Sequence, residues 1–276
     1  MNLNGWQERV RANHLLVFAS YFALACAIMN TPITSAKLAL AFLGGLAIFA
    51  SVYGYNPLTD VKEDNVQKKR TLLDFVGRRT LQACVLVTSL SALGISALLG
   101  IAPFIVALLI LSLGFAYSHQ KIRLKKYFFV KNVAIAIGWL LLFIYFSISL
   151  GDTNISGYLF AAYFMASLSF VGSMLRDIFD LRGDEAAGIH TIPSTIGAQA
   201  TAQLVFLVTF LQYGILLVFV LLNAIPFFYL SFLATLPFRA GIMYAVSKRE
   251  NRLAANLSLL SYPSAALLAF IFKVFT

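Results

Sequence analysis

Carboxylate side chains recur at helical spacing in two short segments of this chain. The first segment runs Asn56-Pro-Leu-Thr-Asp60-Val-Lys-Glu-Asp64 and has the pattern N-x3-D-x3-D. Positions i, i+4 and i+8 of a helix lie on one face, where neighbouring ionised carboxylates repel each other. A divalent cation removes that repulsion, and Mg²⁺ typically binds one or two carboxylates together with substrate phosphates. The spacing therefore indicates a candidate magnesium site.

The second segment runs Arg176-Asp177-Ile-Phe-Asp180-Leu-Arg-Gly-Asp184, and its three aspartates also share one helical face. Either cluster alone is more often a set of solvated surface charges. Two clusters at the ends of apolar segments, with the basic stretch Lys121 to Lys126 between them in sequence, favour a function. Together they predict a site for Mg²⁺ ions and a polyphosphate anion.

The elements that position these residues are apolar. The chain has 276 residues, of which 60% are hydrophobic and 12% are charged, whereas a soluble domain is about 45–50% apolar and about 25% charged. We predict an all-α, polytopic membrane bundle of about nine transmembrane helices around a central cavity, forming one domain over residues 1–276. The predicted spans are residues 14–30, 36–55, 80–99, 101–118, 129–150, 157–175, 200–222, 226–245 and 253–275.

The distribution of basic residues predicts the orientation of the bundle. With the N-terminus in the cytoplasm, all but three of the 21 Lys and Arg residues fall in cytoplasmic segments. This asymmetry is the usual topology signal of a membrane protein. Of the eleven acidic residues, only Asp152 falls on the opposite side. We therefore expect a multi-pass protein of the cell inner membrane, with the N-terminus and the acidic site cytoplasmic.

The net charge of +10 does not indicate nucleic-acid binding. The charge lies in short loops between apolar segments rather than on one continuous basic surface. The expected partners are membrane lipid and small-molecule substrates, and no nucleic acid.

Three motifs together resemble the signatures of the UbiA superfamily of intramembrane prenyltransferases. The segment from Asn56 to Asp64 is similar to the first signature, and the segment from Arg176 to Pro193 is similar to the second. Between them, Ala116-Tyr117-Ser118, Arg123-Leu124-Lys125 and Lys131-Asn132 resemble the middle signature. The resemblance covers roughly residues 11 to 200. The sequence departs from the family at Pro57 and in the stretch from Asn65 to Arg70, which lacks the family's proline.

The resemblance implies a Mg²⁺-dependent transfer of a prenyl group from a prenyl diphosphate to an aromatic or lipid acceptor. Asp60 and Asp64 would bind one Mg²⁺, with Asn56 as a neutral ligand or phosphate donor. Asp180 and Asp184 would bind a second, with Asp177 assisting. The metals would stabilise the departing diphosphate. The remaining substrate-binding residues expected from the resemblance are Arg11, Asn13, Arg70, Tyr117, Lys121, Lys125 and Asn132.

Two alternatives remain open at the level of sequence. A terpene cyclase of the same fold would ionise the prenyl diphosphate and cyclise it without a second substrate. A membrane transporter would need polar groups spread through the membrane depth or broken helices near its midplane. The acidic residues gather at one predicted face, which argues against the transporter.

Overall fold

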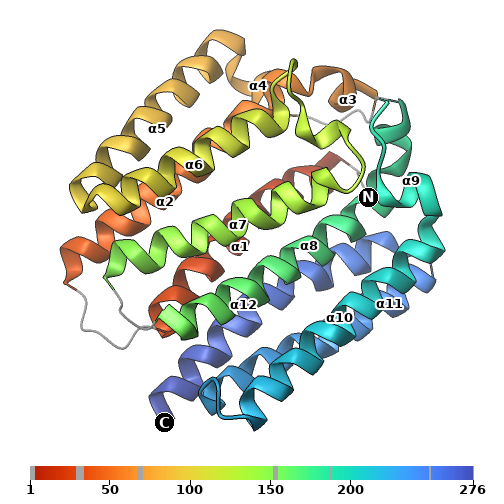
Figure 1. Ribbon diagram of the computed structural model, residues 1–276. Helices are drawn as coiled ribbons and strands as arrows, with labels where there is room; N and C mark the ends of the chain where they lie inside the picture. The colour runs from red at the N-terminus through yellow and green to blue at the C-terminus, as the bar shows by residue number, and fades with distance from the viewer. Residues whose placement is uncertain are drawn as a thin grey trace.

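The computed structural model describes the backbone of residues 4–28, 34–66, 71–151, 155–186, 188–248 and 250–275. These residues fold into helices joined by short loops, and no strand occurs within those ranges. The long helices lie side by side, and the short helices α3, α4 and α9 lie toward one end of the bundle (Figure 1). The α-helices are α1 (Asn4–Ile28), α2 (Ser35–Thr59), α3 (Val61–Val66), α4 (Leu72–Val76), α5 (Arg78–Leu99), α6 (Ile101–Ser118), α7 (Val130–Leu150), α8 (Ile155–Ala186), α9 (Ile192–Ile196), α10 (Ala198–Leu221), α11 (Leu236–Ser247) and α12 (Asn251–Phe275). Two 3-10 helices complete the description, η1 (Leu124–Lys126) and η2 (Phe227–Thr235).

Six helical segments are long and apolar enough to cross a membrane. They are α2, α5, α6, α7, residues 159–181 of α8, and α10. The all-helical membrane fold is thereby confirmed. The first, eighth and ninth predicted spans coincide with shorter apolar helices, His14–Ile28, Phe232–Val246 and Leu260–Ile271. The count of nine spans therefore stays a prediction.

The eighth predicted span shows why that region falls short of a regular transmembrane helix. It begins with the 3-10 helix η2, which follows Pro226, and only then continues as α11. Proline lacks a backbone N–H and is poorly tolerated inside an α-helix. Pro237 stands in the first turn of α11, where a missing N–H costs nothing.

The connection between α5 and α6 is the tight hairpin that the sequence predicts. A single residue, Gly100, separates Leu99 from Ile101. Its backbone has φ of 130°, a conformation that side chains with a Cβ rarely adopt. Its N–H caps α5 by donating to the carbonyl of Ser96.

Helices α2 and α6 approach closely at Gly114. A Cβ atom on Gly114 would lie 2.5 Å from Cγ2 and 2.7 Å from Cγ1 of Val52. Small residues allow this approach where helices pack within a membrane. One turn further along each helix, Ser118 Oγ donates a 2.6 Å hydrogen bond to Asn56 Oδ1. The close approach therefore sets the position of the first residue of the first acidic cluster.

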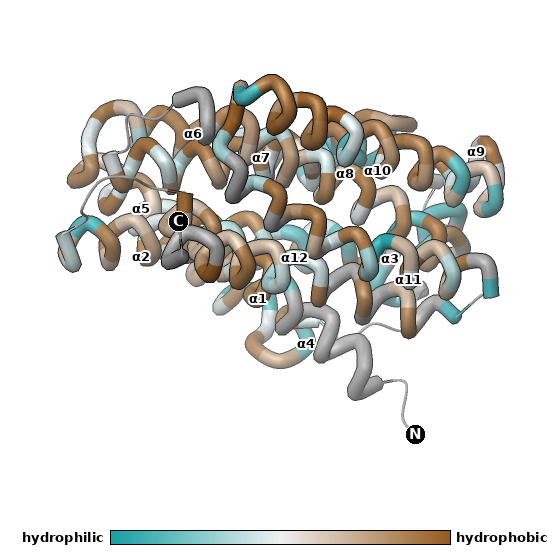
Figure 2. Tube along the Cα trace, turned by 90° about the horizontal axis from the view of Figure 1, so that it is seen from below, coloured by the Kyte–Doolittle hydropathy of each residue, from teal (hydrophilic) through white to brown (hydrophobic). Residues whose placement is uncertain are grey.

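Helix α8 is the central element of the bundle. Of its spanning segment, 61% is buried inside the protein, compared with 22% for α5, which leaves most of α5 available to lipid. Hydrophobic residues dominate the lengths of the helices, and hydrophilic residues appear near α3 and α9 (Figure 2). The second acidic cluster thus extends from the most enclosed helix toward the end of the bundle that holds the short helices.

We predict that Gly114→Ala destabilises the bundle. Val52 is short and β-branched, so it cannot rotate away from the added methyl group and the helices must separate. Overpacking of this kind costs about 1–3 kcal/mol. Thermal unfolding of the detergent-solubilised protein measures the effect. Gly94→Ala on α5 is the matched control, because its Cβ meets nothing within 4 Å. Equal melting temperatures for the two variants would show that the approach is not tight.

Candidate functional site

The first acidic cluster straddles the junction between α2 and α3. Helix α2 ends at Thr59, Asp60 is its C-cap, and α3 begins at Val61. The Asp60 N–H donates to the Asn56 carbonyl and the Asp64 N–H donates to the Asp60 carbonyl, each at 2.9 Å. The i to i+4 hydrogen bonding therefore continues across the junction. The backbone therefore keeps Asn56, Asp60 and Asp64 at helical spacing, as predicted.

Asp60 is paired with a buried lysine. Lys125, from η1, forms an ion pair with the Asp60 carboxylate, and Thr59 Oγ1 donates to the same oxygen at 3.0 Å. Only 5% of Lys125 is exposed. Burial lowers the pKa of Lys125 below its ordinary value, although the Asp60 carboxylate opposes that shift. The predicted phosphate ligand Lys125 is therefore held beside a predicted metal ligand.

The second acidic cluster lies on the last three turns of α8, which runs to Ala186 and so extends past the predicted span. Asp177 and Asp184 are buried and Asp180 is half-buried. Lys131 Nζ, from the first turn of α7, lies 2.8 Å from Asp177 Oδ1 and 2.7 Å from Asp184 Oδ2. Burial raises the pKa of Asp184, against the opposing effect of Lys131. One ammonium group thus bridges two carboxylates that are largely removed from water.

Asn132 fixes the orientation of the most buried aspartate. Its Nδ2 donates to Asp177 Oδ2 and to Ser173 Oγ, both at 2.9 Å, and its side chain is fully buried. The structure therefore brings Asn132 into the second cluster. Its contact there is with a carboxylate, while the predicted contact with substrate stays a prediction.

The two clusters share a neighbourhood near the end of α6, where Asp60, Asp177 and Asp184 all lie within electrostatic range of Tyr117. Helix α3 also contacts α8, and the His190 N–H, beyond α8, donates to the Lys126 carbonyl at 3.4 Å. The α2–α3 junction, η1 and the end of α8 therefore lie close together.

Other predicted residues lie elsewhere or cannot be placed. Lys121 lines a separate pocket beside Tyr55 and Phe115, and the lysines that contact the acids are Lys125 and Lys131. Arg70 lies outside the described residues, as do the side chains of Arg11 and Asn13.

Sequence reasoning missed several contributors. Lys131 was part of a predicted motif but was not predicted as a site residue. Its position beside the predicted residue Asn132 was the signal that could have identified it. Ser118 and Ser173 carry no pattern that marks them as partners of Asn56 and Asn132. His14 Nε2 lies 2.8 Å from Arg176 Nη1, a contact between residues 162 positions apart that no local pattern could reveal.

The donor set fits a metal that is shared with a phosphate substrate. Within the described part of the chain, no three His, Cys, Asp or Glu side chains gather closely enough to hold a metal by themselves. Mg²⁺ is usually bound by one or two carboxylates plus substrate phosphates and water rather than by an all-protein cage. Paired aspartates at two neighbouring positions supply that kind of coordination.

The fold and the site define a helical membrane protein whose two acidic clusters meet at one end of the bundle. The sequence profile of the UbiA prenyltransferase family matches residues 16–271, and the chain belongs to that family.

Individual relatives agree with this assignment. The sequence is 27% identical over 170 residues to digeranylgeranylglyceryl phosphate synthase of Pyrococcus abyssi, a match that spans 61% of this chain and 60% of that protein. A UbiA homologue from Aeropyrum pernix has a similar structure, with a TM-score of 0.78, 15% identity and coverage of 95% and 98% of the two chains. A homologue from Archaeoglobus fulgidus bound to DMAPP and Mg²⁺ has a TM-score of 0.70, 16% identity and 98% coverage of both chains. These structural likenesses establish the shared fold.

We predict that Lys131→Met destabilises the protein more than any exposed lysine substitution nearby. The change leaves Asp177 and Asp184 buried without their counterion, and breaking a buried pair from one side costs about 3–5 kcal/mol. The melting temperature is the measurement, and Lys126→Met, at an exposed lysine on η1, is the control. Adding Asp177→Asn to Lys131→Met should restore part of the loss. If the effects of Lys131→Met and Asp177→Asn on the melting temperature simply add, Lys131 does not pair with Asp177 as the structure shows.

Proposed function

We propose that this chain is a Mg²⁺-dependent intramembrane prenyltransferase that uses a prenyl diphosphate as donor and a glyceryl phosphate lipid as acceptor. The observation that carries the proposal is that the helices of the two acidic clusters are in contact and that each cluster is paired with a lysine. The acceptor class is supported by the name of the Pyrococcus abyssi relative. The donor class is supported by the DMAPP and Mg²⁺ bound to the Archaeoglobus fulgidus homologue.

The aspartates supply the ligands for magnesium in this proposal. Asp60 and Asp64 would hold one ion, with Asn56 as a neutral neighbour, and Asp180 and Asp184 would hold a second. Asp177 assists the second ion. Magnesium supplies charge neutralisation to the diphosphate, which makes it a better leaving group.

The lysines change partners when substrate binds. In the structure, Lys125 neutralises Asp60, and Lys131 neutralises Asp177 and Asp184. With those carboxylates bound to a cation, the two ammonium groups would be available to the phosphate oxygens, for which lysine is a common ligand. The site then keeps its charges balanced with and without substrate.

The chemical step follows from this arrangement. The bond between the allylic carbon and the diphosphate oxygen breaks, and the electron pair leaves with the diphosphate. The electron-rich ring of Tyr117 stabilises the allylic cation, because aromatic faces attract cations. The acceptor hydroxyl then attacks the cation and loses its proton. The excess of Lys and Arg in the loops on this side of the bundle supports a cytoplasmic site at the inner membrane.

We predict that Asp60→Ala and Asp180→Ala each abolish turnover. Loss of a residue that only supports a metal ligand already costs about 10–100-fold, so loss of a ligand should exceed about 100-fold. Steady-state transfer is measured with Mg²⁺, and the melting temperature reports whether the bundle is intact. Asp74→Ala is the control, because the Asp74 carboxylate only caps α4. Wild-type rates in either test variant would remove these residues from the site.

The substrate assignment has a separate test. Purified protein in liposomes is incubated with prenyl diphosphates of increasing chain length and either a geranylgeranylglyceryl phosphate or an aromatic acid acceptor. We expect prenylated product with the glyceryl phosphate lipid and dependence on Mg²⁺ that EDTA removes. If product forms with the aromatic acid and none forms with the glyceryl phosphate lipid, the acceptor is aromatic and the proposed lipid acceptor is wrong. A cyclic hydrocarbon or alcohol formed from prenyl diphosphate alone would replace transfer with cyclisation.

A further inference from the structure

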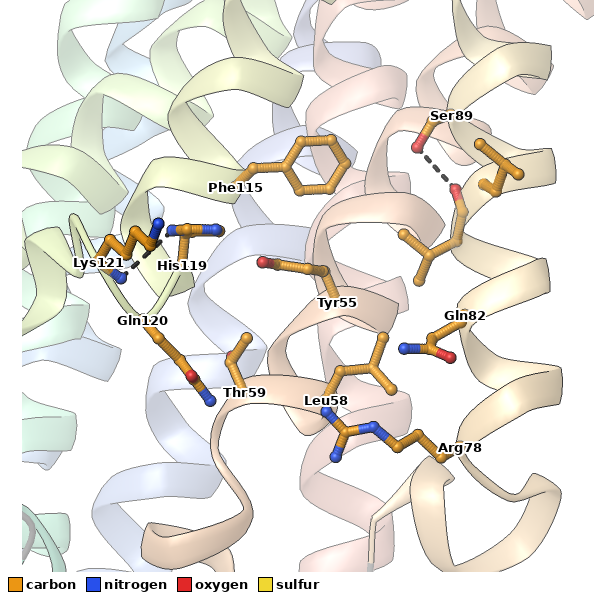
Figure 3. A pocket seen from close by; sticks show the side chains of 12 residues that line it. Tyr55, Leu58, Thr59, Arg78, Gln82, Ser89, Phe115, His119, Gln120 and Lys121 are labelled. Carbon is orange, nitrogen blue, oxygen red and sulfur yellow. Dashed lines mark hydrogen bonds between the residues drawn. The ribbon is translucent and has the colours of Figure 1, made fainter.

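A cavity lies beside the acidic clusters, between α2, α5 and α6. Its volume is about 540 Å³, and Figure 3 shows the side chains around it. Arg78 enters from the start of α5 and Lys121 from the loop after α6, on opposite sides of Tyr55 and Thr59 (Figure 3). Phe115 and Leu86 also line the pocket. The lining therefore combines two basic side chains with apolar ones. This is the pattern expected of a site for an amphiphile with an anionic headgroup.

Among the residues that the structure describes, no acidic side chain lines the pocket. Within the described part of the chain, neither the Arg78 guanidinium nor the Lys121 ammonium has a carboxylate partner. Arg78 is also the first residue of α5, where the helix dipole adds a partial positive charge. Two cations from different helices can bind one phosphate from opposite sides.

The surroundings of the pocket indicate the depth of the bilayer headgroups. The short helix α4, directly before Arg78, exposes 63% of Phe75 and 48% of Leu72. On the other side of the pocket, Ile122 follows Lys121 and is 51% exposed. Exposed apolar side chains next to basic ones are typical of segments that lie in the membrane interface. Leu86 is 61% exposed, so the apolar wall of the pocket continues onto the lipid-facing surface of α5.

We propose that this pocket binds the phosphate headgroup of an anionic phospholipid from the surrounding bilayer. The phosphate lies between Arg78 and Lys121, and the first carbons of an acyl chain follow Phe115 and Leu86. The volume falls within the range of about 300–1,000 Å³ found for small-ligand pockets. It accommodates a headgroup and the start of its chains, while the rest of the lipid stays in the membrane.

The site is next to the acidic site without being part of it. Thr59 lines the pocket, and its Oγ1 donates to Asp60 Oδ1 at 3.0 Å. The carboxylates of the second cluster are bridged by Lys131 from α7, which does not line the pocket. A bound lipid therefore touches the residue that orients Asp60 while leaving the proposed diphosphate position open.

Native mass spectrometry of the full chain tests the proposal. Protein from neutral phosphatidylcholine nanodiscs is titrated with phosphatidylglycerol in the absence of Mg²⁺ and prenyl diphosphate. We expect retained phosphatidylglycerol with wild type and at least about tenfold weaker retention with Arg78→Gln plus Lys121→Gln. Both side chains are exposed, and unchanged melting in phosphatidylcholine confirms that the variant folds.

The control removes the same charge from the same region. Arg79→Gln plus Lys126→Gln alters two exposed cations that do not line the pocket, and lipid retention should be unchanged. Equal loss in both double variants would overturn the proposal in favour of general surface attraction. If inorganic pyrophosphate displaces the lipid, and if this displacement requires Arg78, then the pocket binds a soluble anion and the proposal is overturned. Neither result depends on prenyl transfer, so this proposal and the proposed function fail separately.

Discussion

The structure depends on the neutralisation of carboxylates that are buried near one face of a membrane bundle. A buried carboxylate without a partner costs several kcal/mol of desolvation. Lys131 meets that requirement for two aspartates at once, and Lys125 meets it for Asp60. Because Lys131 stands on α7 and both of its partners stand on α8, the ion pairs also fix the register between those two helices. Charge balance and helix packing are therefore the same constraint here.

That constraint explains why the site is assembled from so many elements. A single helix that carries several aspartates on one face repels itself. The cations come from η1 and α7. The Ser118 hydroxyl donates to the Asn56 amide oxygen, and the Ser173 hydroxyl accepts from the Asn132 amide nitrogen. Close packing at Gly114 brings α6 near enough to α2 for the first of these contacts. Each charged group thus relies on a neighbour from a different part of the chain.

The sequence predicted what is local and missed what is distant. Helical periodicity placed Asn56, Asp60 and Asp64 along one face, and the hydrogen bonds across the α2–α3 junction confirm that spacing. Apolar length identified the spanning helices but could not distinguish η2 from a regular helix. The pairing of Lys131 with Asp184 joins residues 53 positions apart and depends on the packing of α7 against α8. Lys121 and Lys125 are four residues apart and look equivalent in sequence, yet Lys121 lines the pocket beside Tyr55 while Lys125 pairs with Asp60.

The two roles of the basic residues show how topology and chemistry share one set of charges. Lys and Arg at the ends of membrane helices orient a protein during insertion, whatever they contact afterwards. In the folded chain, Lys125 and Lys131 are counterions for aspartates, while Arg78 and Lys121 face an amphiphilic pocket. The acidic residues gain no advantage in insertion from lying on that face, so their accumulation there needs a reason in the folded state. The two lysines supply that reason, because a carboxylate at the edge of a membrane is stable only where a cation pairs with it.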